Sequence, residues 1–388
     1  MSLNILITGA TGYIGGSVLS GLLSSDKPRF EKSQIFVAVR SERHVKTLTE
    51  LGVKVALIDL TDEVSVSEGV LNNDSKDFTS ELRIRDLSSF NAVDFIIHTA
   101  SALEPVQAKN LIAALGKRHN GTKKDVFFIH TSGTSAWSSA FGSTYGLVKD
   151  TDPLFEKEKA IADSFPVRQT DVAVIEEAEK AGVTSYIIPP PIIYGRGDGP
   201  WNKMSAMIPA TINAAISRKV VEKFPNNART MGTHISDLTA YYLRLIEKIL
   251  EGADLPSGKQ GYYFPIAHRF SWWDVLDRIA KALEARGLVE DSEVREWPSY
   301  DVAAEGLSLP AAVIPKLYVA EYILTPQYCL SDCSNEVIGE NKSLIGWVPE
   351  WDEDRFLTQM DDEIKNFLDL GIEKVGLLAA VSQGLGKK

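Results

Sequence analysis

The first half of the chain alternates short, almost wholly apolar runs with longer stretches of helical periodicity. Runs of the first kind are typical of strands buried on both faces of a sheet, and stretches of the second kind are typical of the helices that cover it. The pattern predicts strands at residues 4–8, 35–40, 54–58, 95–99, 126–131 and 184–189. It predicts helices at residues 12–24, 45–51, 106–117 and 167–181. We therefore expect an α/β fold with a parallel sheet covered on both faces.

The alternation weakens after residue 189, and the chain continues as helices and turns with few strands. The pattern there predicts helices at residues 202–217, 237–251, 272–285 and 354–370, and one strand at residues 261–266. Two irregular stretches interrupt the first half: a polar surface insertion at residues 72–80 and a longer loop at residues 138–166. Long loops in compact domains are often lids or binding loops, so the second is a candidate part of a site.

Composition narrows the class of protein. The chain has 388 residues, of which 44% are hydrophobic and 24% charged, as in an ordinary globular protein. A net charge of −11 disfavours nucleic acid and anionic membranes as partners. The longest apolar runs, such as residues 375–381, are far shorter than the roughly 20 residues that span a bilayer, and no leader-like segment precedes the first strand. We expect a cytoplasmic protein that binds neither a membrane nor nucleic acid.

Metal-binding patterns are missing from the sequence. The two cysteines, Cys329 and Cys333, are too far apart for a C-x-x-C motif, and the six histidines show no paired spacing. We expect no metal site.

A glycine-rich turn, TGATGYIG from Thr8 to Gly15, connects the first predicted strand to the first predicted helix. Gly9 permits a tight turn, Gly12 lets backbone N–H groups approach a pyrophosphate, and Gly15 lets the helix pack closely on the strand. The helix N-terminus adds partial positive charge. A turn that serves only the strand-to-helix geometry is the alternative. The favoured interpretation is a dinucleotide site formed by Gly9, Thr11, Gly12, Tyr13, Ile14 and Gly15.

With its G-x-x-G-x-x-G spacing, this turn resembles the opening of the extended and atypical branches of the short-chain dehydrogenase/reductase superfamily, near the NmrA-like and NAD-dependent epimerase-like proteins. The resemblance covers most of the chain. It implies a doubly wound Rossmann domain and a smaller, mostly C-terminal substrate-binding domain. The Rossmann domain would comprise residues 1–193 with parts of 225–270. The substrate-binding part would comprise residues 194–224 and 271–388.

The resemblance also implies cofactor contacts beyond the glycine turn. Asp59 and Leu60 follow the third strand, where the family contacts adenine. Small residues follow the fourth strand, Thr131 closes the fifth, and a proline-tyrosine-glycine element that lies by the nicotinamide follows the sixth. The residues implied are Asp59, Leu60, Thr99, Ala100, Ser101, Thr131, Pro190 and Pro191.

Arg40, at the end of the second strand, bears on which dinucleotide is bound. An NAD enzyme presents a carboxylate there to the ribose hydroxyls, whereas an NADP enzyme presents a cation to the 2′-phosphate. A solvated surface arginine is the alternative. We expect NADP(H) as the cofactor.

Typical members of the superfamily polarise a carbonyl with a Ser or Thr hydroxyl and deliver the proton from a Tyr with a Lys four residues later on one helix face. Here the helix at residues 167–181 carries Val167 and Asp171 at those two positions, and neither can do that chemistry. At the hydroxyl position stands Gly133, with Ser132 and Thr134 on either side. The site therefore departs from the usual pattern.

Tyr145 and Lys149 have the required spacing, but in a stretch rich in glycine and serine rather than in a predicted helix. If the protein reduces a carbonyl, we expect Ser132 to supply the hydroxyl, Tyr145 the proton and Lys149 its electrostatic partner. A chance Tyr–Lys pair on a surface loop is the alternative.

These observations favour an NADP(H)-dependent oxidoreductase that reduces a carbonyl or related group on a small, partly apolar molecule. A nucleotide-sugar epimerase or dehydratase is a second hypothesis, with a cluster of basic residues for the diphosphate. A non-catalytic NADP(H)-sensing regulator that binds a protein partner is a third, favoured by the missing helical Tyr–Lys pair. A homodimer is left open. The aromatic residues considered for the cleft are Trp137, Tyr194, Trp201, Tyr262, Tyr263, Trp272 and Trp273, and the basic residues are Arg196, Lys203, Arg218 and Arg229.

Overall fold

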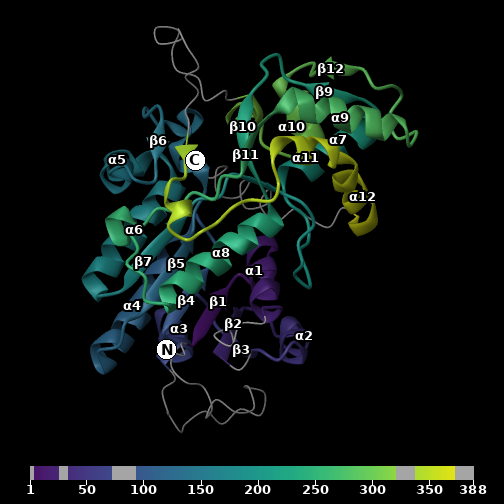
Figure 1. Ribbon diagram of the computed structural model, residues 1–388. Helices are drawn as coiled ribbons and strands as arrows, with labels where there is room; N and C mark the ends of the chain where they lie inside the picture. Colours follow the sequence, from purple (N-terminus) through teal and green to yellow (C-terminus); the bar gives the residue numbers. More distant parts are fainter. Residues whose placement is uncertain (1–3, 26–33, 72–92, 320–336, 372–388) are drawn as a thin grey trace.

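The computed structural model describes residues 4–25, 34–71, 93–319 and 337–371 (Figure 1). Its centre is a six-stranded parallel sheet with the strand order β3-β2-β1-β4-β5-β7. The strands are β1 (Ile5–Thr8), β2 (Ile35–Val39), β3 (Lys54–Leu57), β4 (Phe95–His98), β5 (Phe127–Thr131) and β7 (Thr184–Ile188). The order reverses at β1 and β4, which confirms the expected doubly wound α/β fold. The predicted insertion at residues 72–80 and the two cysteines lie outside the described residues.

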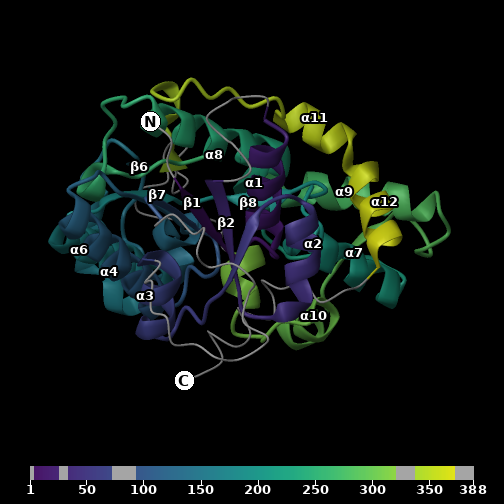
Figure 2. The same ribbon diagram turned by 90° about the horizontal axis from the view of Figure 1, so that it is seen from below.

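Alternate residues of each strand enter two different cores. Leu6 and Phe128 pack on one face of the sheet with α3 (Glu63–Leu71), α4 (Pro105–Thr122) and α6 (Pro166–Ala181). Ile7 and Ile97 pack on the other face with α1 (Tyr13–Leu23), α2 (Val45–Glu50) and α8 (Ile235–Leu250). Figure 2 shows α3, α4 and α6 on one side of the strands and α1 and α8 on the other. Burial on both faces explains why these strands are apolar at every position.

Local signals position the two helices nearest the candidate site. Proline occupies the first turn of α4 and of α6, where its missing N–H costs no helical hydrogen bond. Gly182 ends α6 in the left-handed region, with φ of 70°. Both helices begin at the carboxyl edge of the sheet, so their first turns face the same edge as the glycine turn.

A third core lies beyond β7, around Phe270, Trp272 and Phe356. Its strands form two small sheets, with the orders β11-β10-β8 and β12-β9. The elements are β8 (Ile192–Tyr194), α7 (Met207–Arg218), β9 (Val221–Lys223), β10 (Arg229–His234), β11 (His268–Ser271), α9 (Trp272–Glu284), β12 (Val294–Glu296), α10 (Tyr300–Leu307), α11 (Glu353–Thr358) and α12 (Met360–Leu370). The weak alternation in this half of the sequence reflects the shortness of these strands.

Three predictions of local structure were wrong. The strand expected at residues 261–266 forms only an isolated bridge between Ile187 and Tyr262, because Gly261 fits tightly against the Ser185 carbonyl and Pro265 lacks an N–H. The helix expected from residue 202 begins at residue 207. The stretch at residues 138–166 contains the short helix α5 (Leu154–Ala160) and the strand β6 (Val148–Lys149), which pairs with β13 (Val337–Ile338). These elements are too short for their periodicity to show.

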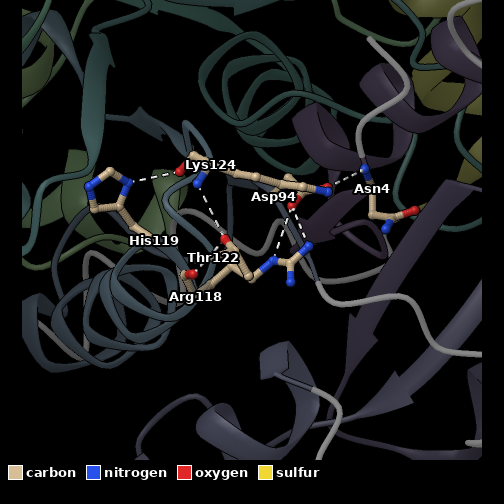
Figure 3. Close-up of polar contacts among 6 residues, drawn as sticks. All are labelled: Asn4, Asp94, Arg118, His119, Thr122 and Lys124. Atoms are coloured by element: carbon tan, nitrogen blue, oxygen red, sulfur yellow. Dashed lines mark hydrogen bonds and ion pairs between the residues drawn. The ribbon is translucent and has the colours of Figure 1, made fainter.

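The amino edge of the sheet is fastened by Asp94, which is 3% exposed (Figure 3). One of its carboxylate oxygens accepts hydrogen bonds from the Arg118 guanidinium at 3.0 and 3.2 Å. The other accepts the N–H of Asn4 at 3.3 Å. These contacts join the last turns of α4 to the starts of β1 and β4, at the edge opposite the glycine turn.

Within the described part of the chain, no helix is long and apolar enough to cross a membrane. The same residues contain no cluster of three or more His, Cys, Asp or Glu side chains arranged to hold a metal ion.

Candidate functional site

The glycine turn has the geometry of a phosphate cradle. Gly9 has φ of 76°, and a side chain there would lie 2.7 Å from the backbone of Thr99 and Ala100. The Gly12 N–H donates to the Gly9 carbonyl at 2.8 Å, and Gly12 caps α1, whose first turn has no acidic residue. A side chain at Gly15 would overlap the Thr99 hydroxyl and the Gly9 carbonyl. The N-terminus of α1, whose first turn has no acidic side chain, is favourable for an anion.

The other predicted residues of this turn differ in exposure. Thr11 and Ile14 are half-buried, whereas Tyr13 is buried. The Tyr13 hydroxyl donates to the Gly195 carbonyl at 2.7 Å, and burial raises the pKa of this phenol. Tyr13 thus joins the glycine turn to the loop that follows β8.

Arg40 is exposed at the carboxyl end of β2 and makes no ion pair within the described ranges. Asp59 lies close enough for Arg40 to contribute to a lowered pKa of its carboxyl, although hydrogen bonds from Thr61 contribute more. Arg43 donates to His44 at 2.9 Å, and the His44 ring packs edge-on against Trp201 at 4.6 Å. Arg40 is thus a cation free to meet a ligand beside β2.

Of the residues predicted to follow β3 and β4, Thr99 and Ala100 lie against the glycine turn. The Thr99 hydroxyl donates to the Thr8 carbonyl at 2.7 Å, and the Ser101 hydroxyl accepts from the Leu103 N–H at 3.1 Å. Leu60 is buried and Ala100 is exposed.

Successive residues at the end of β5 point to opposite faces of the sheet. The Thr131 hydroxyl bonds the Tyr242 hydroxyl of α8 at 2.6 Å. The Ser132 hydroxyl donates to Asp171 of α6 at 2.5 Å. The backbone N–H of Thr134 donates to the Pro190 carbonyl at 3.0 Å. Ser132 therefore lies at the carboxyl edge, next to the segment that contains Pro190 and Pro191.

Tyr145 and Lys149 are not on a helix. The half-buried Tyr145 ring lies 6.5 Å from the Trp137 ring, centroid to centroid, and Lys157 lies over it at 5.7 Å. The Lys149 ammonium pairs with Glu340 at 2.7 Å. The structure brings neither residue into hydrogen-bond contact with Ser132, whose side chain is bonded to Asp171. Their catalytic roles stay a prediction.

Asp171 belongs to a buried polar network that sequence reasoning missed. Glu158 of α5 lies beside it and accepts a hydrogen bond from the Tyr262 hydroxyl at 2.6 Å. Nε2 of His130 lies 3.4 Å from Oδ1 of Asp171. Arg168, one turn before Asp171 on α6, donates to the carbonyls of Ala136 and Phe141. The network members Glu158, His130, Arg168, Asp171 and Tyr262 are each at most 1% exposed.

Burial controls ionisation in this network. It raises the pKa of Asp171 to about 7 and raises the pKa of Glu158, with repulsion from Asp171 as a further cause. It lowers the pKa of His98 to about 4 and holds that of His130 well below its ordinary value, so both imidazoles are neutral. Arg168 is the one cation in the network.

At the end of β8, the Tyr194 hydroxyl bonds Nε2 of His268 at 2.7 Å. Gly195 has φ of 91° and packs against the His234 ring, and its N–H donates to Glu363 of α12 at 2.6 Å. Most aromatic residues considered for the cleft are buried in the cores, including Trp137, Tyr262 and Tyr263. Trp272 and Trp273 line a small cavity in the third core, together with Phe224, Trp297 and Tyr318.

Comparisons with known proteins agree with this architecture. Residues 1–114 match the NmrA-like family model. The oxidase ucsJ from Acremonium sp is 24% identical over 326 residues, which cover 78% of this chain and 85% of that protein.

Solved structures share the fold over nearly the whole chain. Vestitone reductase from alfalfa (Medicago sativa) is 18% identical with a TM-score of 0.53, and the match covers 94% of this chain and 98% of that one. The yeast methylglyoxal/isovaleraldehyde reductase Gre2, complexed with NADPH, is 13% identical with a TM-score of 0.56 and coverages of 95% and 99%. UDP-glucose 4-epimerase from Thermotoga maritima, with UDP-glucose, is 12% identical with a TM-score of 0.56 and coverages of 94% and 100%. The fold is that of the extended short-chain dehydrogenase/reductases, as the sequence resemblance implied.

Proposed function

We propose that the protein is an NADP(H)-dependent oxidoreductase that reduces a carbonyl or related group on a small molecule. The observation that carries the proposal is the placement of the glycine turn after β1 and the Ser132 hydroxyl after β5 on one edge of a doubly wound sheet. Ligands bind such sheets in the crevice outside the carboxyl ends of the strands. The NADPH in the yeast reductase of the same fold supports a nicotinamide cofactor.

The residues of this edge fit the cofactor's parts. Gly9 and Gly12 would admit the pyrophosphate at the N-terminus of α1, and Arg40 would pair with the 2′-phosphate. Asp59 would contact the adenine, and Pro190 and Pro191 would lie by the nicotinamide. When bound, the reduced nicotinamide supplies a hydride.

Ser132 would polarise the substrate carbonyl with its hydroxyl, because a donor aimed at the developing oxyanion stabilises the transition state. Tyr145 would give the oxygen its proton, with Lys149 as electrostatic partner. Arg168 and Lys157 are further cations near Tyr145: burial lowers the pKa of the Arg168 guanidinium and Tyr145 raises it, and Lys157 lies over the Tyr145 ring.

The epimerase or dehydratase hypothesis draws less support. Three of the four basic residues considered for a diphosphate have carboxylate partners: Arg196 with Asp369 at 3.8 Å, Arg218 with Glu222 at 2.5 Å, and Arg229 with Glu353 at 3.6 Å. Their charge is already compensated.

One specific observation supports the sensing-regulator hypothesis. Val167 is buried in the apolar core and Asp171 in the polar network, so the first turns of α6 present no Tyr–Lys pair.

Purified protein should be titrated with NADPH and NADH and then assayed for NADPH oxidation against a panel of aldehydes and ketones. Oxidation that depends on an added carbonyl compound is expected. Tight NADPH binding with no turnover on any member of the panel would favour the regulator. No binding of either dinucleotide would contradict both.

A further inference from the structure

We propose that Asp171, which lies beside the second buried carboxyl of Glu158, is a positioning residue whose protonation decides whether the Ser132 hydroxyl can donate to a substrate. The inference rests on the proposed function, because it assigns Ser132 to the substrate carbonyl. It is carried by the 2.5 Å contact between Oγ of Ser132 and Oδ2 of Asp171 inside a network closed to solvent.

A count of hydrogens shows why this contact matters. A serine hydroxyl has one hydrogen and two acceptor lone pairs. When Asp171 is ionised, the hydrogen of Ser132 points at the carboxylate, and only lone pairs face a substrate oxygen. When Asp171 is protonated, its carboxyl donates to Oγ, and the hydroxyl hydrogen is released toward the substrate. Only the protonated state of Asp171 makes Ser132 a donor.

The surroundings of Asp171 favour a proton on one of the two carboxyls. Arg168 of α6 is the only cation of the network, whereas Asp171 and Glu158 of α5 would carry two negative charges if both ionised. Burial of an uncompensated charge is costly, so one carboxyl stays protonated at neutral pH. Tyr262 adds no charge, because burial raises the pKa of its phenol.

His130 and His98 add no charge, because burial lowers the pKa of both rings. Oδ1 of Asp171 faces Nε2 of His130 at 3.4 Å. In the His130 tautomer with hydrogen on Nε2, Oδ1 of Asp171 faces the partial positive charge of that N–H group. The proton of Asp171 then belongs on Oδ2, which faces Ser132.

Asp171→Asn distinguishes this role from a structural one, because an amide N–H₂ donates permanently as the protonated carboxyl does. In the wild type, kcat for carbonyl reduction should fall about tenfold per pH unit above the pKa of Asp171, which lies at about 7. Asp171→Asn should stay active and lose this alkaline fall. Asp171→Ala, which removes the competing acceptor, should also lose the alkaline fall, whereas Ser132→Ala removes the donor and should lower kcat ~10²-fold at every pH. A folded Asp171→Asn that is inactive, or that keeps the fall, overturns the proposal.

Glu158→Gln should move the alkaline fall in kcat to lower pH. Asp171 is then the one carboxyl beside the Arg168 cation, and this favours its ionised form. Asp237→Asn is the matched control, because Asp237 is a buried carboxyl of α8 whose hydrogen bonds go to the backbone of Glu350 and Trp351. It should leave the profile unmoved. An unchanged profile in Glu158→Gln would exclude the influence of Glu158 on the proton of Asp171.

Infrared difference spectra of the cofactor-free protein provide a readout that does not depend on turnover. The wild type at pH 6 should show C=O bands of protonated carboxyls that disappear at high pH, and the band of Asp171 should be the one that is missing from Asp171→Asn. If that band is unchanged in Asp171→Asn, the proposal fails whatever the activity. If the band behaves as expected but no carbonyl compound is reduced, the proposed function fails and the proton on Asp171 stands.

Discussion

The ammonium of Lys149 and the carboxylate of Glu340 form an ion pair of 2.7 Å that joins the strand β6 to the segment after β13. Glu340 also accepts a hydrogen bond from Thr151. The hydrogen bond between Lys149 and Glu340 raises the pKa of the Lys149 ammonium. The sequence alone predicted Lys149 as the electrostatic partner of Tyr145. The ion pair gives Lys149 a structural task as well.

Tyr145→Phe should lower kcat for carbonyl reduction ~10²-fold with little change in KM, because it removes only the acidic proton. If Lys149 assists Tyr145, Lys149→Met should also lower kcat, whereas Glu340→Gln, which frees the ammonium, should not. If the pair serves only to join the two segments, both variants should lose similar stability and keep kcat. Unchanged turnover in Tyr145→Phe would rule out its role as donor.

Gly12→Val should abolish dinucleotide binding and leave the protein folded. A side chain at Gly12 would meet only the Gly9 carbonyl, at 3.1 Å, but it would occupy the space that a pyrophosphate needs. Gly15→Val is the matched comparison and should unfold or strongly destabilise the protein, because its side chain would overlap Thr99. Circular dichroism and an NADPH titration separate the two effects. Retained binding in Gly12→Val would mean that the turn serves packing alone.

Arg40→Ala should weaken NADPH binding about 10- to 150-fold, which corresponds to the roughly 1.5–3 kcal/mol of a charge-assisted hydrogen bond, and should leave NADH binding nearly unchanged. Lys46→Ala, which removes an exposed lysine paired with Glu50, is the control for general charge effects. Isothermal titration of both dinucleotides measures the difference. Equal wild-type affinities for NADPH and NADH would sink the assignment to the 2′-phosphate.

The sequence predicted the sheet and the glycine turn because both depend on local rules. Strands buried on two faces are apolar throughout, and the backbone at Gly9 and Gly15 leaves no room for a side chain. The prediction of a strand at residues 261–266 was wrong because this apolar run is buried without forming a strand. Tyr262 and Tyr263 fill the two cores on either side of the sheet. Apolar runs alone do not distinguish a strand from a buried connection.

The polar network could not be predicted in the same way. Ser132 was identified from its place after β5, but Asp171 appeared in the sequence only as a residue unable to replace a lysine. Its partners Glu158 and Tyr262 are 104 residues apart and meet through the fold. A charged residue at a buried helical position, such as Arg168 or Asp171 within the apolar face of α6, was the one available signal.

Glu363 offers a test of how the third core is held to the Rossmann sheet. This carboxyl of α12 is 8% exposed and accepts the Gly195 N–H at 2.6 Å, while the Gly195 carbonyl accepts from Tyr13. Burial raises the pKa of Glu363 to about 7, and Asp362 adds to the rise. Because the pKa of Glu363 is higher in the folded protein than in the unfolded chain, its protonated form stabilises the folded protein.

Glu363 should therefore make the free energy of unfolding fall as pH rises. Its contribution is complete below the ordinary glutamate pKa and is lost as pH passes through the folded value, by at most about 3 kcal/mol for the shift to about 7. Glu363→Gln keeps an oxygen for the Gly195 N–H but cannot ionise. The free energy of unfolding in urea of Glu363→Gln, compared with that of the wild type, should therefore be higher at pH 8 than at pH 5. Glu284→Gln, at an exposed position of α9, should show no such difference. An equal stability change at both pH values in Glu363→Gln would mean that this carboxyl is ionised in the folded protein.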